Sequence, residues 1–301
     1  MMPPDRFVAF ILTHRRPDRV LTYRALRRAG YTGPILLVVD SEDPTAPEYR
    51  ARYGDEVVVF DLPAARTITD AGDNFDRGSV LFARNACFDI AVARGFSHFI
   101  ELDDDYRIFE HRYTSTGSYR ESPVRSMNAA VGFLVEYAEG IGATSVALAQ
   151  NGDFIGGGDG APTPRTRRKA MNSFVCSTAR RFSFHGRMND DVNTYIAQGR
   201  SGALFLTVFN LSLSQGATQA NAGGLTELYL DLGTYVKSFY SVMYAPSCVK
   251  IGTMAGNDGL GSKGPPRIHH AINWRAAVPR ILDEKWRKPR GQDPGPGALD
   301  G

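Results

Sequence analysis

Three consecutive carboxylates close an apolar run in the first third of the chain. Residues 99–102 form that run, and Asp103, Asp104 and Asp105 follow it directly. Carboxylates at the end of a buried strand repel one another and lose hydration, so a cation is the simplest compensation. Mg²⁺ and Mn²⁺ take oxygen ligands and usually share them with the phosphates of a substrate. The triplet therefore predicts a divalent-metal site for a diphosphate; the plainer alternative is an acidic turn in which Asp103 caps a helix.

Two adjacent histidines, His269 and His270, are candidates for a further ligand of the metal. They lie on an alternating segment, residues 268–274, so their side chains are expected on opposite faces and only one can reach the ion. His269 shares its face with Arg267 and Asn273, whereas His270 shares a face with apolar residues. His269 is therefore predicted as the ligand, and a structural histidine in the core is the alternative.

The predicted elements bring polar clusters to one edge of a sheet. Residues 7–12 form an apolar strand that ends in the polar cluster 13–18, a helix follows up to Gly30, and the strand 35–39 ends before Asp40. A strand, a helix and a strand within about forty residues predict a right-handed βαβ unit with parallel strands. Ligands of such sheets bind beyond the carboxyl ends of the strands, where these clusters fall.

The remaining elements continue the chain as one domain with a mixed second half. Further strands are predicted at 57–60, 145–149, 173–176, 203–208 and 268–274, and further helices at 77–94, 126–140, from about 189, and at 225–240. No internal repeat or proline-rich linker divides the chain. Residues 287–301 are rich in Lys, Arg, Pro and Gly with almost nothing apolar, so a disordered basic tail is expected there.

Composition excludes several classes of protein. The 301 residues are 43% hydrophobic and 22% charged, which is typical of a globular chain and not of a disordered or collagen-like one. The net charge of +3 predicts no strong global attraction to a polyanion or a bilayer. Three cysteines are too few for a disulfide framework, the start of the chain lacks a signal-peptide pattern, and no run approaches the ~18 apolar residues of a membrane span. A cytoplasmic protein is expected, in the host cell cytoplasm if the source is viral.

Five motifs in this order resemble those of a known family. They are Phe82-Ala83-Arg84-Asn85, Glu101-Leu102-Asp103-Asp104-Asp105-Tyr106, Asn151-Gly152-Asp153, Met188-Asn189-Asp190-Asp191-Val192-Asn193 and the pair His269-His270. The first third resembles a GT-A glycosyltransferase with its DxD motif. The whole set is similar to the TET-associated glycosyltransferases of bacteriophages and spans most of residues 6–286.

The resemblance implies a single GT-A domain over 1–286, with a Rossmann-like, mostly parallel sheet flanked by helices. Residues 6–110 would form the half that binds a nucleotide sugar, and residues 111–286 a mixed half that binds the acceptor. The implied reaction moves a hexose from a UDP-sugar, such as UDP-glucose or UDP-GlcNAc, to 5-hydroxymethylcytosine in DNA. Mn²⁺ or Mg²⁺ would offset the charge on the departing diphosphate, held by Asp105 with Asp103 nearer the ribose.

The resemblance also implies roles on the acceptor side. A hydroxymethyl oxygen needs a base that takes its proton, and Asp191 is expected in this role with Asp190 bonding the sugar or the acceptor. The alternative for the pair is plain complementation of a helix dipole. The glycine-dense loop 151–160 does not match a P-loop, and a lid is expected there.

Two further sets of residues follow from the same resemblance. The residues expected to bind the donor are Thr13, His14, Arg15, Arg16, Asp40, Arg84, Asn85, Asp103, Asp104 and Asp153. The basic residues expected to meet DNA phosphates are Arg165, Arg167, Arg168 and Lys169. A surface arginine at Arg84, a simple turn at Asp40 and a solvated basic face are the alternatives.

Other functions stay open on the sequence. A GT-A enzyme could act on a protein, lipid or polysaccharide, and a sugar nucleotidyltransferase often shares the front-half fold, although it normally has a glycine-rich first loop that residues 13–18 lack. A DNA-binding module with a decayed site is the alternative from another class. The identity of the sugar, inversion or retention, duplex or single-stranded acceptor, and the oligomeric state are open as well.

Overall fold

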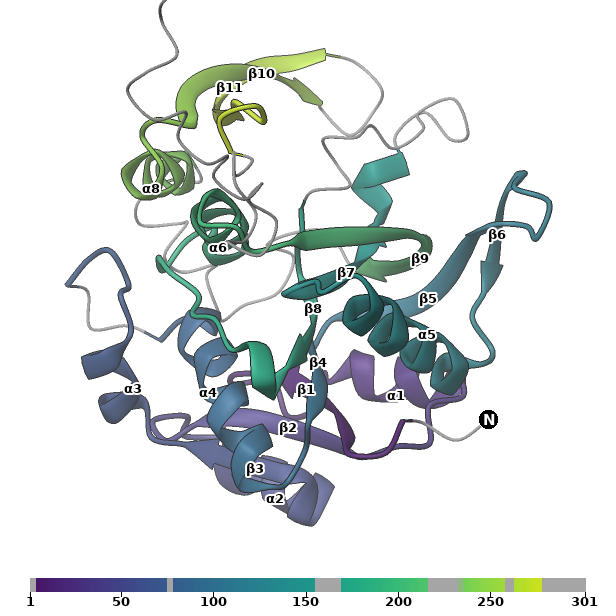
Figure 1. Cartoon of the computed structure of the whole chain (residues 1–301). Coiled ribbons are helices and arrows are strands. Elements are labelled where there is room, and N and C mark those ends of the chain that lie inside the picture. Colours follow the sequence, from purple (N-terminus) through teal and green to yellow (C-terminus); the bar gives the residue numbers. More distant parts are fainter. Residues whose placement is uncertain are drawn as a thin grey trace, which may run out of the picture.

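A nine-stranded mixed sheet lies at the centre of the computed structural model (Figure 1). Its strand order is β3-β2-β1-β4-β8-β7-β9-β5-β6, and β10 and β11 form a separate two-stranded sheet. The structure describes residues 4–74, 78–154, 169–215, 233, 235–257 and 263–277. The predicted tail 287–301 and the basic residues Arg165, Arg167 and Arg168 lie outside the described residues.

The first four strands of the sheet are parallel, as predicted. β1 (Phe7–Leu12) pairs with β2 (Ile35–Asp40) on one side and with β4 (His98–Asp103) on the other. All six residues of β1 and of β2 are buried, which explains why both strands are continuous apolar runs. In this register Leu12 lies beside Val38 and Asp103, so the three strands end at one edge.

Two helices in this half were predicted and two were not. The predicted ones are α1 (Leu21–Arg28) and α4 (Val80–Ala93), and the others are α2 (Ala46–Tyr53) and α3 (Leu62–Ile68). β3 (Val57–Phe60) completes the parallel set beside β2. α2 and α3 each begin with a proline in the first turn, where the missing N–H needs no partner.

The second half of the sheet is mixed, as predicted. β8 (Ser173–Ser177) runs antiparallel between β4 and β7 (Ser145–Gln150), and β9 (Phe205–Gln215) runs parallel to β7. β5 (Tyr106–Tyr113) and β6 (Tyr119–Pro123) were not predicted, because β5 carries charged residues among its apolar ones. The α/β class with a mixed second half is therefore confirmed.

The remaining elements differ in extent from their predictions. α5 (Met127–Gly140) and α6 (Asp190–Arg200) agree with the sequence analysis, whereas α8 covers Val236–Tyr244 and residues 225–232 lie outside the described part. β11 (Lys263–Ile272) pairs with an unpredicted β10 (Val249–Asn257). Three short 3₁₀ turns are η1 (Gly54–Glu56), η2 (Asn151–Phe154) and η5 (Thr178–Arg180).

Helices cover both faces of the sheet and divide the core in two. Side chains of α1, α2 and α5 pack on one face together with alternate residues of β1, such as Ala9 and Ile11. Side chains of α3, α4 and α6 pack on the other with Val8 and Phe10. Within the described ranges, no helix combines the length and apolar character needed to cross a membrane.

Candidate functional site

One edge of the sheet collects the polar residues that the sequence analysis singled out. β1, β2, β4 and β7 all run in the same direction, since β8 is antiparallel to both of its neighbours. Their carboxyl ends are followed by the segments 13–16, 40–43, 103–105 and 151–153. The expected gathering of these clusters at one edge is confirmed.

Asp104 is used to tie two of these segments together. Its carboxylate is buried and accepts a hydrogen bond from Thr13 Oγ1 at 2.7 Å and one from Arg16 Nη1 at 3.2 Å. The Tyr49 hydroxyl lies 2.6 Å from Thr13 Oγ1 and accepts from the Arg16 N–H at 2.9 Å. Three of the residues expected to bind the donor thus hold one another, and Tyr49 joins them although it was not predicted.

Asp103 and Asp105 differ sharply in their surroundings. Asp103 accepts hydrogen bonds from Arg84 Nη2 and from the Tyr106 hydroxyl, both at 3.2 Å. Asp105 is half-buried and makes no hydrogen bond or ion pair with any described residue. Burial, followed by the charges of Asp103 and Asp104, raises the pKa of Asp105 to about 6. Asp105 is therefore a carboxylate held in an unfavourable place, which a bound cation would relieve.

Thr22 fixes the backbone of the acidic turn, which consists of residues 103–105 at the end of β4. Its hydroxyl donates to the Asp103 carbonyl at 2.6 Å and accepts from the Tyr106 N–H at 2.9 Å, while its own N–H donates to the Asp104 carbonyl at 3.1 Å. Thr22 is fully buried in the first turn of α1. Thr22 was not predicted as a site residue, and its only signal in the sequence is a small polar side chain on the core face of a helix.

Arg84 lies in the middle of a buried group of carboxylates. Its guanidinium is 3% exposed and lies 2.8 Å from Asp190, 3.2 Å from Asp103 and 3.6 Å from Glu101. The ring of Phe174 packs against the guanidinium as well. Neither Glu101 oxygen has a hydrogen-bond partner, and burial raises the pKa of Glu101 despite the opposing charge of Arg84. In this structure Arg84 therefore joins α4, β4 and α6 from inside the protein.

The two aspartates at the start of α6 have separate partners. Asp190 faces Arg84, and burial, opposed by Arg84, raises the pKa of Asp190 to about 7. Asp191 is also buried, with a raised pKa for the same main reason. One of its oxygens, Oδ1, accepts from the Val192 N–H at 2.7 Å, while Oδ2 has no partner among the described residues. Asp190 is therefore paired with Arg84, whereas Asp191 keeps one oxygen without a partner among the described residues.

The cap of α6 is a strained asparagine held by α8. Asn189 has a left-handed φ of 54°, and its side-chain amide donates to the Lys237 carbonyl at 3.0 Å and to Ser241 Oγ at 3.1 Å. Non-glycine residues in this region are uncommon and need such support. The cap sets the direction in which the acidic pair leaves the loop.

A compact group of His14, Asp40 and Asp43 lies beyond β1 and β2. Its ligand-type atoms are within 4.8 Å of one another, and it is the one such group of three His, Cys, Asp or Glu residues in the described part of the chain. His14 Nδ1 lies 2.6 Å from Asp40 and 3.6 Å from Asp43. Although burial opposes the shift, the hydrogen bond and charge of His14 lower the pKa of Asp40. Asp43 was not predicted.

Backbone groups already occupy many oxygens of this group. Asp43 accepts from the N–H of Arg15 at 2.7 Å and of Thr45 at 2.8 Å, and Asp40 accepts from the Glu42 N–H at 3.0 Å. Arg15, beside it, has a φ of 55°, and its exposed guanidinium makes no ion pair with the described residues. The three side chains can bind a cation. The two carboxylates can equally orient the His14 ring next to a bound nucleotide.

The structure does not bring the predicted third metal ligand together with both aspartates. Asp103, Asp105 and His269 do not form a group of ligand atoms within 4.8 Å, although all three are described. The rings of His269 and His270 stack with centroids 4.2 Å apart, so they do not point to opposite faces as expected. His270 approaches the Asn189 amide at 3.4 Å.

Three other predicted site residues have partners within the protein. The Asn85 amide makes two hydrogen bonds to the backbone of Phe184, at 2.8 and 3.1 Å. Asp153 forms an ion pair with Lys169 and accepts from the Gln150 N–H at 3.0 Å. Lys169 is thus neutralised locally rather than left as a free basic residue.

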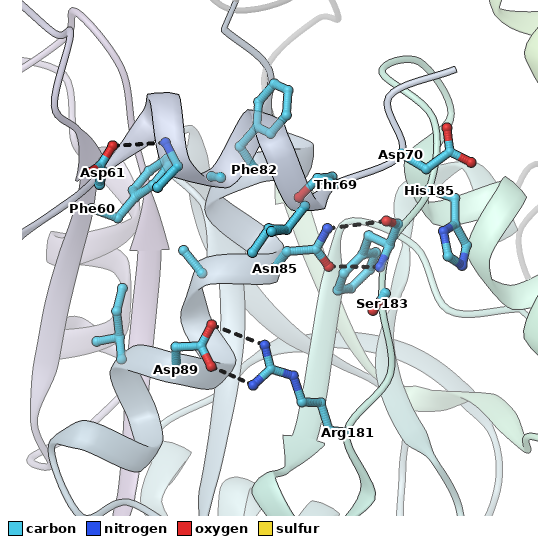
Figure 2. A pocket seen from close by; sticks show the side chains of 16 residues that line it. Phe60, Asp61, Thr69, Asp70, Phe82, Asn85, Asp89, Arg181, Ser183 and His185 are labelled. Carbon is cyan, nitrogen blue, oxygen red and sulfur yellow. Dashed lines mark hydrogen bonds and ion pairs between the residues drawn. The ribbon is translucent and has the colours of Figure 1, made fainter. Parts of the chain in front are cut away.

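A separate hollow of about 370 Å³ lies between α3, α4 and residues 181–185 (Figure 2). Its lining includes Asn85, which is hydrogen-bonded to the backbone of Phe184, and the ion pair of Arg181 with Asp89, as Figure 2 shows. None of the carboxylates that Arg84 contacts lines it. This hollow is therefore distinct from the acidic edge of the sheet, which is formed by the segments 13–16, 40–43, 103–105 and 151–153.

Comparisons with known proteins bear on the family and the fold. The glucosyl-3-phosphoglycerate synthase of Mycobacterium tuberculosis, solved with Mn²⁺, uridine-diphosphate and phosphoglyceric acid, is similar at 10% identity, covering 88% of this chain and 86% of that one, with a TM-score of 0.45. Mannosyl-3-phosphoglycerate synthase from Rubrobacter xylanophilus is similar at 14% identity, with the same coverages and a TM-score of 0.42. TarS of S. aureus is similar at 10% identity, covering 77% of this chain but only 39% of TarS, with a TM-score of 0.41. At identities of 10–14% and TM-scores of 0.41–0.45, these structures carry no conclusion about the activity of this chain.

The sequence itself is more informative about kinship. No curated protein matches the chain. The family model described as TET-Associated Glycosyltransferase matches residues 7–224, which is most of the chain and includes the acidic edge and α6. The expected resemblance is thereby confirmed. The chain belongs to the TET-Associated Glycosyltransferase family and is a glycosyltransferase.

Proposed function

We propose that this glycosyltransferase moves a hexose from a UDP-sugar to the hydroxymethyl group of 5-hydroxymethylcytosine in DNA and depends on Mn²⁺ or Mg²⁺. The family supports the acceptor, because TET-type oxidation of methylated cytosine produces that hydroxyl group. The observation that carries the catalytic part is Asp105, a half-buried carboxylate with a raised pKa and no partner among the described residues.

The acidic turn fits a divalent cation better than the His14 group does. The Asp105 oxygens are free, and Asp103 beside it keeps further lone pairs after its two hydrogen bonds. We assign the metal to Asp105 and Asp103, and we keep His269 as the proposed third ligand. When bound, the ion offsets the charge that develops on the departing diphosphate.

Asp191 is the proposed general base. In an inverting transfer the acceptor oxygen attacks the anomeric carbon, the bond from that carbon to the diphosphate oxygen breaks, and the hydroxyl proton passes to the base. Asp191 Oδ2 is available and its pKa is raised, which favours uptake of a proton. Asp190 is held by Arg84, so we propose that it positions the start of α6 and borders the sugar.

The loops after β1 and β2 are the proposed nucleotide site. The half-buried His14 ring is oriented by Asp40, and Arg15 presents a guanidinium that is free of described acidic residues. A charge-assisted hydrogen bond from an arginine suits a diphosphate oxygen. These loops are held together by Thr13, Arg16 and Asp104. The elements around them are held in place by Arg84, Asn85 and Asp153.

A transfer assay tests the proposal. The protein is incubated with labelled UDP-glucose or UDP-GlcNAc, Mn²⁺, and either hydroxymethylated or unmodified DNA, and the nucleosides are analysed by mass spectrometry. We expect a hexose mass on 5-hydroxymethylcytosine only. Absence of transfer to hydroxymethylated DNA with every donor would refute the acceptor, and release of pyrophosphate would indicate a nucleotidyltransferase instead.

A further inference from the structure

One tyrosine on α6 has a hydroxyl group that the fold leaves without a partner. Tyr195 is only 5% exposed, and its hydroxyl makes no hydrogen bond with any described residue. Buried polar groups in proteins are nearly always hydrogen-bonded, so such an exception needs an explanation. The Tyr195 hydroxyl is also absent from the group of fully enclosed atoms that lack partners, so the oxygen keeps some surface that water can touch.

The helix places this tyrosine beside the proposed base. Tyr195 follows Asp191 by four residues on α6, so the two side chains lie on the same face, one turn apart. The charges of Asp191 and Asp153 both act on the phenol and, after burial, raise its pKa. The hydroxyl therefore stays protonated at neutral pH and can donate a hydrogen bond.

The ring of Tyr195 is fixed from behind. The indole of Trp274 stacks on it with centroids 6.0 Å apart and an interplanar angle of 6°. Trp274 belongs to the turn after β11, whose Asn273 N–H donates to the Cys248 carbonyl at 2.6 Å. A stacked, buried ring presents its hydroxyl in one direction at little entropic cost.

We propose that the Tyr195 hydroxyl hydrogen-bonds the acceptor molecule next to the hydroxyl group that Asp191 deprotonates. This inference rests on the proposed function for the identity of the base and deepens it by adding an acceptor-binding residue. An acceptor that reaches Asp191 Oδ2 lies within one helical turn of the phenol. The contact fixes the acceptor and does not touch the nucleotide, because the proposed nucleotide loops follow β1 and β2.

Replacing Tyr195 by phenylalanine removes this hydrogen bond alone. The ring and its stack on Trp274 remain, and no protein hydrogen bond is lost, so the melting temperature is expected to stay the same or to rise. The acceptor KM is expected to increase about 3- to 10-fold, the size of one neutral hydrogen bond. The donor KM and the slow hydrolysis of the UDP-sugar without acceptor are expected to remain within about 2-fold.

Tyr31→Phe is the matched control. The Tyr31 hydroxyl donates to the Pro34 carbonyl at 3.1 Å before β2, at the opposite edge of the sheet. Its loss should lower stability slightly and leave both KM values unchanged. A Tyr195→Phe protein with an unchanged acceptor KM, with a raised donor KM instead, or with a lower melting temperature and proportionate loss of all activities would overturn the inference.

The same assays separate this inference from the proposed function. If wild-type protein hydrolyses a UDP-sugar but transfers nothing to hydroxymethylated DNA, the proposed acceptor is wrong. The Tyr195 comparison is then made with whichever hydroxylated acceptor the wild type uses, taken from a panel of a peptide, a polysaccharide and a nucleoside. If transfer to DNA occurs and Tyr195→Phe behaves as wild type, only the inference about Tyr195 fails.

Discussion

At the scale of single residues, Asp105 gives the sharpest test of the metal site. The Asp105→Asn substitution removes a half-buried charge that burial, Asp103 and Asp104 disfavour and that Arg16 offsets only in part. We expect transfer to fall roughly 100-fold or more, because charge on the leaving diphosphate is no longer offset. Isothermal titration should show weaker Mn²⁺ binding, while the melting temperature without metal should rise.

Asp43→Asn is the control for the alternative metal group. Asp43 lies with His14 and Asp40, and its oxygens mainly hold backbone N–H groups. We expect a higher KM for the donor and an unchanged concentration of Mn²⁺ for half-maximal activity. If Asp43→Asn instead abolishes Mn²⁺ binding while Asp105→Asn does not, the metal belongs to the His14 group.

The acidic residues of the site also predict how stability depends on pH. Asp190 and Asp105 have folded-state pKa values of about 7 and about 6, above their ordinary value of 3.8, so the folded state binds more protons than the unfolded state between those limits. Lowering the pH from 7.5 to 5 should therefore raise the melting temperature of the metal-free protein.

Activity should change in the opposite direction over that range. Protonation of Asp191 removes the base, so transfer should decline as the pH falls while stability grows. Below pH 4.5 the melting temperature should fall. Arg180 lowers the pKa of Glu139 to about 2 in the folded state, so at this pH Glu139 takes up a proton in the unfolded chain first. A melting temperature that falls steadily from pH 7.5 to 5 would contradict this account.

At the scale of elements, Arg84 is the residue that joins three of them. It contacts carboxylates of β4 and α6 from its place on α4, and its guanidinium is nearly fully buried. Arg84→Met leaves those carboxylates uncompensated in the core, so we expect a loss of about 3–5 kcal/mol in the free energy of unfolding. Urea denaturation measures it.

Arg181→Met is the matched substitution, because it removes an exposed ion pair of the same helix. Arg181 pairs with Asp89 of α4, and both side chains are about half exposed. Its loss should cost at most about 1 kcal/mol, because exposed ion pairs are screened by water. Equal losses in the two variants would show that Arg84 is not the special link between α4, β4 and α6.

Elements buried on both faces could be predicted, and the contacts of the site could not. β1 and β2 are uninterrupted apolar runs, and the triplet after β4 follows from the same pattern. β5 was missed because Arg107, Glu110 and Arg112 interrupt its apolar residues. The roles of Thr22, Glu101 and Tyr195 depend on side chains from distant parts of the chain, and no local spacing encodes such contacts.

At the scale of the whole molecule, the small net charge limits how DNA can be held. With +3 overall, and with Lys169 paired to Asp153, attraction to phosphates depends on local clusters such as Arg165, Arg167 and Arg168. Few phosphate contacts imply a shallow dependence of affinity on salt, since each contact releases about one counterion.

Changing Arg165, Arg167 and Arg168 together to alanine tests this view. We expect the slope of log affinity against log salt to become less negative by about 2–3, and the affinity to fall equally for hydroxymethylated and unmodified DNA. Fluorescence anisotropy at several salt concentrations measures both quantities. The KM of the donor should not change, because these arginines are not among the residues proposed to bind the nucleotide. An unchanged slope would move the DNA contacts to another surface, and a loss restricted to hydroxymethylated DNA would show that these arginines recognise the base instead of the backbone.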